Sequence, residues 1–386
     1  MKILLSLLGI IYGSILSAQM SDIQIHNYLN QLNSDSISNH ISQLENFQTR
    51  WAKDSNHREV AFYIKDKMEL YQLRVRIDSF YMYWDTPPTW QYNVVGILDG
   101  SIDTNSIYML GAHYDAINPL DSTHAPGADD NASGMAALFE IARVMKENSY
   151  IPTHTIYFIG FAAEEQGLKG SGYEASVICQ TKPIVYFLNN DMISNNMELE
   201  SNWKVKLHTY DNSNDVTDYA LEMMNTFTTL TDTIIPDNCN CTDSRPFYDW
   251  GAKTIFFHEY NFSPFYHSEN DLVANIDKSY CTEVTKISFA MLLKSTSTST
   301  GIEEFTENDV YIFPNPTKDF ISINSKDELS FVEIYNPLGI KLKTINSLNG
   351  FNRIDLSELT PGMYILETTS NTTKRTLKNS FFFVKM

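Results

Sequence analysis

The stretch from Gly160 to Gly172, GFAAEEQGLKGSG, places two adjacent glutamates directly after an apolar run. That run, THTIYFI, is rich in β-branched and aromatic residues and predicts a buried strand. Neighbouring carboxylates repel each other, and burying either of them costs free energy. Glu164 and Glu165 therefore belong either to a solvated loop or to a site that holds positive charge.

Strands and helices alternate on both sides of this stretch. The apolar segments VVGILDG, SIYMLGAHYDA and KPIVYFLNND predict further strands, and the region from Ser21 to about Leu73 has helical spacing. A helix is also predicted for ASGMAALFEIARVMKEN, whose apolar residues share one face: Met135, Leu138, Phe139, Ala142 and Met145. The alternation predicts an α/β fold with a mostly parallel central sheet flanked by helices.

Polar side chains follow three of the predicted strands. His113 and Asp115 are two residues apart in LGAHYDA, so a strand puts both on one face. The glutamate pair follows a second strand, and Asp191 follows a third. Ligands of open α/β sheets bind beyond the carboxyl ends of the strands, so we expect these side chains to converge on one crevice.

Two further segments extend this set. Asp129 and Asp130 lie in the turn of APGADDNASG just before a predicted helix, and His267 lies in the polar segment FYHSEND. Taken singly, an acid pair before a helix usually caps it, and a lone loop histidine usually faces solvent. Together, two histidines and at least four carboxylates predict a site for zinc or a similar divalent metal.

Charge and the N-terminal segment restrict the partners and the location. The formal net charge of -19 argues against nucleic acid and anionic membranes as partners. The N-terminal segment MKILLSLLGIIYGSILSAQM predicts a secretory signal peptide over residues 1–18. An uncleaved anchor is the alternative, but this apolar stretch is shorter than the roughly 20 residues that a membrane span needs. No other segment is long and apolar enough for stable membrane insertion.

The chain has four cysteines: Cys179, Cys239, Cys241 and Cys281. An exported chain can form disulfides, although sequence alone does not give their connectivity. Cys239 and Cys241 are too close in sequence for an easy mutual bridge. We therefore expect one disulfide from this pair to Cys281.

The composition changes near residue 295. The segment KSTSTSTGIEEFTEND is rich in Ser and Thr and then acidic, which predicts a linker over residues 296–307. Short β-patterned segments separated by Gly, Pro and Asn follow it. They predict a small all-β sandwich over residues 308–386.

Residues from about 90 to 275 resemble the secreted co-catalytic di-zinc aminopeptidases of the bacterial leucyl-aminopeptidase type. The motifs that carry the resemblance are GAHYD, GADDNASG, AAEEQGLKGS, NNDMI and YHSEND. The resemblance implies a zinc exopeptidase fold for a catalytic domain over residues 19–295. It also implies a hydrolase that acts on peptides with a free N-terminus.

The same resemblance implies two zinc ions per chain and a role for each site residue. One zinc would be held by His113 and Asp191 and the other by Glu165 and His267, with Asp130 bridging both. Glu164 would be the general base. Asp115 would orient His113 through its second ring nitrogen.

One motif departs from the family pattern. The family usually has Ser-Asp-His near the last strand, where this chain has Thr242, Asp243 and Ser244. Ser244 is not among the implied metal ligands. The departure therefore concerns the substrate pocket and the rate rather than the zinc site.

Residues from about 308 to the end resemble the C-terminal sorting domain of the type nine secretion system of Gram-negative bacteria. The motifs PNP, YNPLG and GMY occur in the expected order, while the final FFFVKM departs from the usual Lys-rich end. The resemblance implies contact with the secretion machinery and a secreted or cell-surface location. A generic β-sandwich that binds another ligand is the alternative.

The leading hypothesis is a secreted zinc aminopeptidase, and three alternatives stand beside it. A glutaminyl cyclase of the same fold uses a single zinc and lacks the first histidine ligand, so His113 favours hydrolysis. A carboxypeptidase or dipeptidase needs a basic pocket, for which Arg245 and Lys253 are the nearby cations. A non-catalytic binding protein would be expected to have lost a ligand or the base, and all six residues are present.

Overall fold

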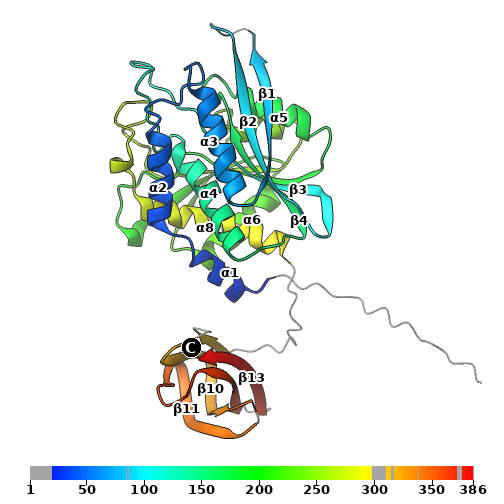
Figure 1. The fold of residues 1–386 in the computed structure, drawn as a ribbon, viewed down its shortest axis with the longest axis vertical. Coiled ribbons are helices and arrows are strands. Elements are labelled where there is room, and N and C mark those ends of the chain that lie inside the picture. Colours follow the sequence, from blue (N-terminus) through cyan, green and yellow to red (C-terminus); the bar gives the residue numbers. More distant parts are fainter. Residues whose placement is uncertain are drawn as a thin grey trace, which may run out of the picture. The chain divides into compact units, whose positions relative to one another are not determined.

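The computed structural model describes residues 20–297 except 84 and 86, and residues 310–385 except 314–316, 338 and 372–375. Its contacts divide the chain into two compact units, Met1–Thr300 and Gly301–Met386 (Figure 1). The predicted signal peptide lies outside the described residues, as does the predicted linker apart from residues 296 and 297.

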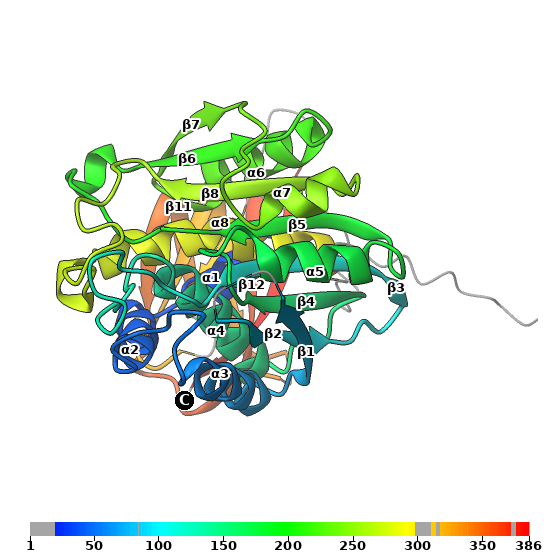
Figure 2. The ribbon, with the colours of Figure 1, turned by 90° about the horizontal axis from the view of Figure 1, so that it is seen from above.

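The first unit is built on an eight-stranded sheet with the order β1-β2-β4-β3-β5-β8-β6-β7 (Figure 2). Its four central strands are parallel to one another: β4 (His154–Phe161), β3 (Asp103–His113), β5 (Ile184–Asn190) and β8 (Thr254–Glu259). The flanking strands are β1 (Arg74–Met82), β2 (Thr89–Leu98), β6 (Lys204–Thr209) and β7 (Thr231–Ile235). Antiparallel pairs join β1 to β2, β2 to β4 and β6 to β8, while β7 is parallel to β6.

Helices cover both faces of this sheet, as predicted for an α/β fold. One apolar core involves α1 (Asp22–Leu29), α2 (Ser34–Glu45), α3 (His57–Leu70), α4 (Ala132–Glu147), α6 (Asn214–Phe227) and α8 (Lys278–Thr296). The other involves α5 (Lys169–Ile178) and α7 (Ser244–Asp249). Neighbouring β3 residues divide between them, with Leu110 in the first core and Met109 in the second. Two short 3-10 turns, η1 (Glu200–Asn202) and η2 (Val273–Asn275), complete the unit.

The second unit is all-β, as the sequence predicts. It consists of β9 (Val310–Phe313), β10 (Phe320–Tyr335), β11 (Lys341–Asp355), β12 (Gly362–Asn371) and β13 (Thr376–Lys385). All pairings between these strands are antiparallel. The unit has its own buried core, which includes Ile323, Val332, Leu366 and Phe383.

The hydropathy of the helices bears on whether any of them could cross a membrane. Within the described parts of the chain, no helix combines the length and the apolar character that crossing a membrane requires.

Candidate active site

The carboxyl ends of β3, β4 and β5 bring the predicted site residues together. His113 is the last residue of β3, Glu164 and Glu165 follow β4, and Asp191 follows β5. Asp130 from the turn before α4 joins these four residues around one cavity of about 320 Å³. The convergence expected from the parallel strands is therefore present.

Asp130 lies between two groups of potential metal ligands. In the first group, Nε2 of His113 is 3.2 Å from Oδ1 of Asp130 and 3.2 Å from Oδ1 of Asp191. In the second group, Nε2 of His267 is 3.2 Å from Oδ2 of Asp130 and 3.0 Å from Oε2 of Glu165. Each oxygen of the Asp130 carboxylate thus faces a different histidine.

The second group has the chemistry of a cation site. Oε1 of Glu165 is buried and has no hydrogen-bond partner among the described residues, while Nε2 of His267 is buried between two carboxylates without forming a well-aligned hydrogen bond to either. Burial, followed by the charge of Asp130, raises the pKa of Glu165 to about 8. A divalent cation would supply the missing partner and favour the ionised carboxylate, and the mixed nitrogen and oxygen donors suit zinc.

Asp115 contacts both His113 and the turn that carries Glu164 and Glu165. Nδ1 of His113 lies 3.1 Å from the backbone oxygen of Asp115 and 3.6 Å from its Oδ1. The Asp115 carboxylate accepts hydrogen bonds from the backbone N–H groups of Glu164, at 3.0 Å, and Glu165, at 3.3 Å. Asp115 therefore contacts the predicted histidine mainly through its backbone and also holds the turn that carries both glutamates.

Glu164 has the environment of a proton-transfer group. It is 9% exposed and lines the cavity. Burial raises its pKa well above the usual range, and the charges of Asp243 and Asp191 raise it further. A carboxylate whose pKa is raised is a stronger base than a solvent-exposed glutamate.

Buried polar residues hold the turn that carries Asp130. The Asp271 carboxylate accepts hydrogen bonds from the backbone N–H groups of Asp129, at 2.8 Å, and Asp130, at 3.0 Å. Arg50 is fully buried and donates to the backbone oxygens of Tyr114 and Gly127, both at 2.7 Å. These contacts fix the turn with which α4 begins.

The side chain of Asp129, the neighbour of Asp130, is hydrogen-bonded to Ser194 and does not line the cavity. Its Oδ1 accepts hydrogen bonds from the backbone N–H of Ser194, at 2.9 Å, and from the hydroxyl of the same residue, at 2.7 Å. Of the two aspartates in the turn, only Asp130 lines the cavity.

Comparison with known proteins gives the family. The model of peptidase family M28 matches residues 93–292, just over half of the 386 residues. The chain belongs to peptidase family M28. A second model, that of the secretion system C-terminal sorting domain, matches residues 311–380.

Individual relatives agree with the M28 assignment. A probable zinc metalloprotease of Pyrenophora teres f. teres is 32% identical over 206 residues, which cover 48% of this chain and 44% of the relative. Leucine aminopeptidase 1 of Paracoccidioides brasiliensis is 28% identical over 160 residues, which cover 38% and 39%. The chain thus spans less than half the length of either relative.

A solved structure shows the same fold. The LapA aminopeptidase of Legionella pneumophila matches with a TM-score of 0.63 and 21% identity, over 77% of this chain and 80% of that chain. The M28 unit described above therefore has the α/β fold of known aminopeptidases.

The departure at residues 242–244 lies beside the M28 site. Thr242 donates a hydrogen bond of 2.6 Å to Oδ2 of Asp191 and accepts one of 2.6 Å from Nδ2 of Asn189. Ser244 is buried and does not line the cavity. No role for Thr242 was predicted from the sequence, in which its place beside Asp243 in the departing motif is the only signal.

The other wall of the M28 cavity was not predicted. It includes Lys206 and His208 of β6, Phe256 and His258 of β8, and the nearby residues Met192, Cys241, Phe262 and Tyr266. The two basic residues named from the sequence do not line it. Arg245 pairs with Asp249 at 2.8 Å, and Lys253 pairs with Asp215 at 2.5 Å.

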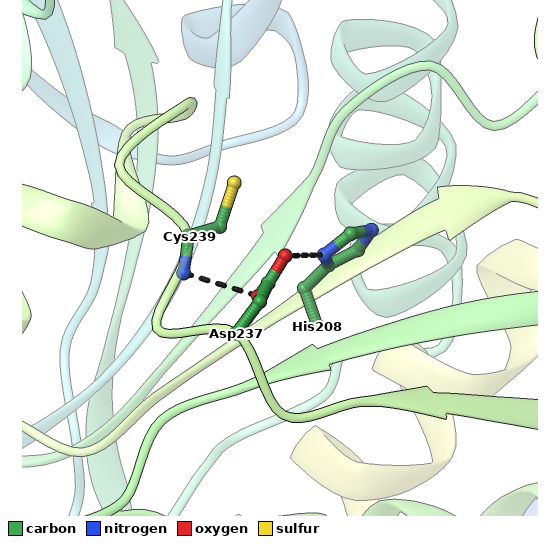
Figure 3. Close-up of side chains that lie close together, drawn as sticks. All are labelled: His208, Asp237 and Cys239. Carbon is green, nitrogen blue, oxygen red and sulfur yellow. Dashed lines mark hydrogen bonds and ion pairs between the residues drawn. The ribbon is translucent and has the colours of Figure 1, made fainter.

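A third cluster of potential ligands includes His208 of this wall together with Asp237 and Cys239 (Figure 3). Asp237 lies between the other two residues: its Oδ2 is 3.0 Å from Nδ1 of His208, and its Oδ1 accepts a 3.1 Å bond from the backbone N–H of Cys239. Cys239 forms a disulfide with Cys241. Its sulfur is therefore not a thiolate, and the cluster does not fit zinc.

This disulfide corrects the cysteine prediction. Cys239 pairs with Cys241 rather than with Cys281, which is buried in α8 as a free thiol. The Cα atoms of the bonded pair are 5.3 Å apart, within the usual range for a disulfide, because the chain between them bends.

Proposed function

We propose that this M28 chain is a secreted zinc aminopeptidase that removes N-terminal residues from peptides. The observation that carries the proposal is the arrangement around Asp130, in which one carboxylate faces two histidines and each histidine has a second acidic partner. Two zinc ions per chain would be held by the five predicted ligands: His113, Asp130, Glu165, Asp191 and His267.

The chain's own residues would bind the substrate and move the proton. When bound, the zinc ions would supply Lewis-acid activation of a water molecule and of the scissile carbonyl. Glu164 would take a proton from the attacking water and deliver it to the leaving amine, as its raised pKa allows. Asp115 would keep Glu164 in place through the bond to its backbone N–H.

The charge of the cavity supports selection of a free N-terminus. Asp130, Glu165 and Asp191 would be neutralised by the proposed zinc ions, which leaves the Glu164 carboxylate in the same cavity to attract a cationic group such as a terminal ammonium. A blocked N-terminus would lack this attraction.

Export is proposed from the second unit. The sorting-domain match supports passage through a type nine secretion system to the outside of the cell or to the cell surface. We propose the domain boundaries expected from the sequence: a signal peptide over 1–18, a catalytic domain over 19–295, a linker over 296–307 and a sorting domain over 308–386.

The test compares leucyl-p-nitroanilide with its N-acetylated form, using the purified chain from residue 19 and measuring zinc in the same sample. We expect cleavage of the free-amine substrate only, two zinc ions per chain, and no cleavage by the Glu164→Gln variant. Bound zinc without cleavage of either anilide would contradict the aminopeptidase proposal. Cyclisation of an N-terminal glutamine in that case would establish a glutaminyl cyclase.

A further inference from the structure

Strands β6 and β8 form a cavity wall that supplies none of the proposed zinc ligands. Lys206 lies directly opposite His258 in their antiparallel register, and His208 lies directly opposite Phe256. Alternate residues of a strand point to the same face, so these four side chains form one patch. All four line the cavity that contains the five proposed ligands.

Lys206 is the single lysine or arginine among the cavity-lining residues of the described chain. It is half-buried, and within the described residues its ammonium group has no hydrogen bond and no ion pair. The nearby Glu259 carboxylate is already engaged by the backbone N–H groups of Asn195 and Ser263. A partly buried ammonium group without a counterion is costly, and this acidic chain offers many carboxylates that could have paired with it.

The neighbouring lysine on the same face of β6 provides a contrast. Nζ of Lys204 lies over the ring of Tyr260, 4.9 Å from its centroid, and Lys204 does not line the cavity. Of these two lysines, only Lys206 presents an uncompensated charge to the cavity.

A second polar group without a partner lies opposite Lys206. His258 is 7% exposed, and its Nδ1 has no hydrogen-bond partner among the described residues. The bond from His208 to Asp237 holds a third polar ring beside these two. The Nδ1 atom of His258 is itself buried, so Lys206 is the unpartnered charged group of this wall that a ligand in the cavity can reach.

Three other residues of this wall are apolar. Met192, Phe256 and Phe262 line the cavity around Lys206 and His258. A short aliphatic side chain that ends in a carboxylate matches this combination, because methylene groups contact the apolar residues and the charged end reaches the ammonium group.

We propose that Lys206 binds a carboxylate of the peptide substrate, and that this wall is a carboxylate-binding subsite of the peptidase. The inference rests on the proposed aminopeptidase function and names its substrate class. Two parts of a peptide offer this chemistry: the side chain of an N-terminal Asp or Glu, and the free C-terminus of a dipeptide. The experiment below distinguishes them.

The test uses the full chain from residue 19, loaded with zinc, and two matched substrate pairs. Glutamyl- and glutaminyl-p-nitroanilide differ only in the side-chain carboxylate, and Leu-Leu and Leu-Leu-amide differ only in the terminal carboxylate. We expect Lys206→Met to lower the preference for the acidic member of one pair by about tenfold to a hundredfold, the usual value of a hydrogen bond to a charged group. Lys204→Met is the matched control on the same strand and should leave both preferences unchanged.

The outcomes separate this inference from the proposed function. A lost glutamyl preference assigns the carboxylate to the N-terminal side chain, and a lost Leu-Leu preference assigns it to the C-terminus. Cleavage of neutral substrates with both preferences unchanged in Lys206→Met would overturn the subsite while leaving the aminopeptidase function intact. If Lys206→Met does not fold, as judged by circular dichroism, Lys206→Gln replaces it.

If no substrate is cleaved, the proposed aminopeptidase function is wrong. Ligand-binding measurements then test the carboxylate-binding subsite on their own. Calorimetry would compare glutamate hydroxamate with glutamine hydroxamate, and Leu-Leu with Leu-Leu-amide. At least tenfold tighter binding of one acidic ligand, lost in Lys206→Met, would support the subsite. Equal binding within both pairs, or no binding at all, would overturn it.

Discussion

The hydroxyl of Thr242 lies 2.6 Å from Oδ2 of Asp191, while the other oxygen of this carboxylate lies 3.2 Å from Nε2 of His113. One oxygen is thus held by a threonine and the other is left to face the proposed zinc. Contacts of this kind orient metal ligands and commonly change metal affinity by 10–100-fold.

We predict that Thr242→Val weakens the binding of one zinc ion by about tenfold or more, because Asp191 loses the donor that orients it. Competition with a fluorescent chelator would measure the affinity. Thr242→Ser retains a hydroxyl and should bind zinc nearly as well as the wild type. Equal affinity of the valine and serine variants would show that the hydrogen bond does not position Asp191.

Glu164→Gln should lower kcat by about 10²–10⁴-fold, because an amide cannot accept the proton from the attacking water. Zinc content should stay unchanged, since Glu164 is not among the proposed ligands. Steady-state kinetics and metal analysis of the same sample test both points. Glu165→Gln is the contrasting variant and should lose zinc; retention of both ions in that variant would contradict the ligand assignment.

Chelation should lower the melting temperature of the protein, because zinc neutralises several buried carboxylates that otherwise repel one another. A thermal scan with increasing free zinc should show a rising midpoint. His267→Ala removes a proposed ligand and should reduce the shift. An identical zinc dependence in this variant would place the binding elsewhere.

Arg50→Ala should destabilise the first unit by about 3 kcal/mol or more, because its buried guanidinium group donates to several backbone oxygens that would lose their partner. Urea unfolding would measure the loss. Arg58 lies on the surface over the ring of Phe62, and Arg58→Ala should change stability by only about 0.5 kcal/mol. Similar losses in both variants would argue against a special role for the buried arginine.

The buried His40 side chain should make the stability of the protein depend on pH. Burial, followed by the charge of Lys67, lowers its pKa from 6.5 to about 4. Between these two values the unfolded state binds more protons than the folded state, so His40 makes stability rise as pH rises from about 4 to 6.5. The rise should be smaller in His40→Gln, as measured by urea unfolding at pH 4.5 and pH 7.

The exposed His124 provides the matched control for this measurement. His124→Gln should keep the wild-type dependence, because its side chain is 60% exposed. If His40→Gln and the wild type gain the same stability over this pH range, the buried imidazole is not the source of the dependence.

The sequence alone predicted the elements that hold the metal-binding side chains. The strands that end near His113, Glu164 and Asp191 are long apolar runs, and the helix after Asp130 has a clear apolar face. Both signals are local, because the period of a strand or a helix is visible within a few residues. Parallel strands align their carboxyl ends, so the meeting of these residues could be inferred before the structure was known.

Other elements lacked such a signal. The segment Arg74–Met82 alternates charged and apolar residues and forms the edge strand β1, which the sequence analysis did not identify. Strand β6, which carries Lys206, has the same alternating character, with Val205 and Leu207 in the core and the residues between them half-buried. The disulfide between Cys239 and Cys241 depends on a local bend that no residue pattern indicated.

The sequence by itself therefore determined the α/β class, the all-β second unit, the family and the set of residues around Asp130. Only the tertiary structure decided which residues complete the cavity. Lys206 meets His258, and Thr242 meets Asp191, across about 50 residues of intervening chain. Such contacts depend on strand register and on the packing of the whole unit, which are set by the burial of many side chains together and not by any local pattern.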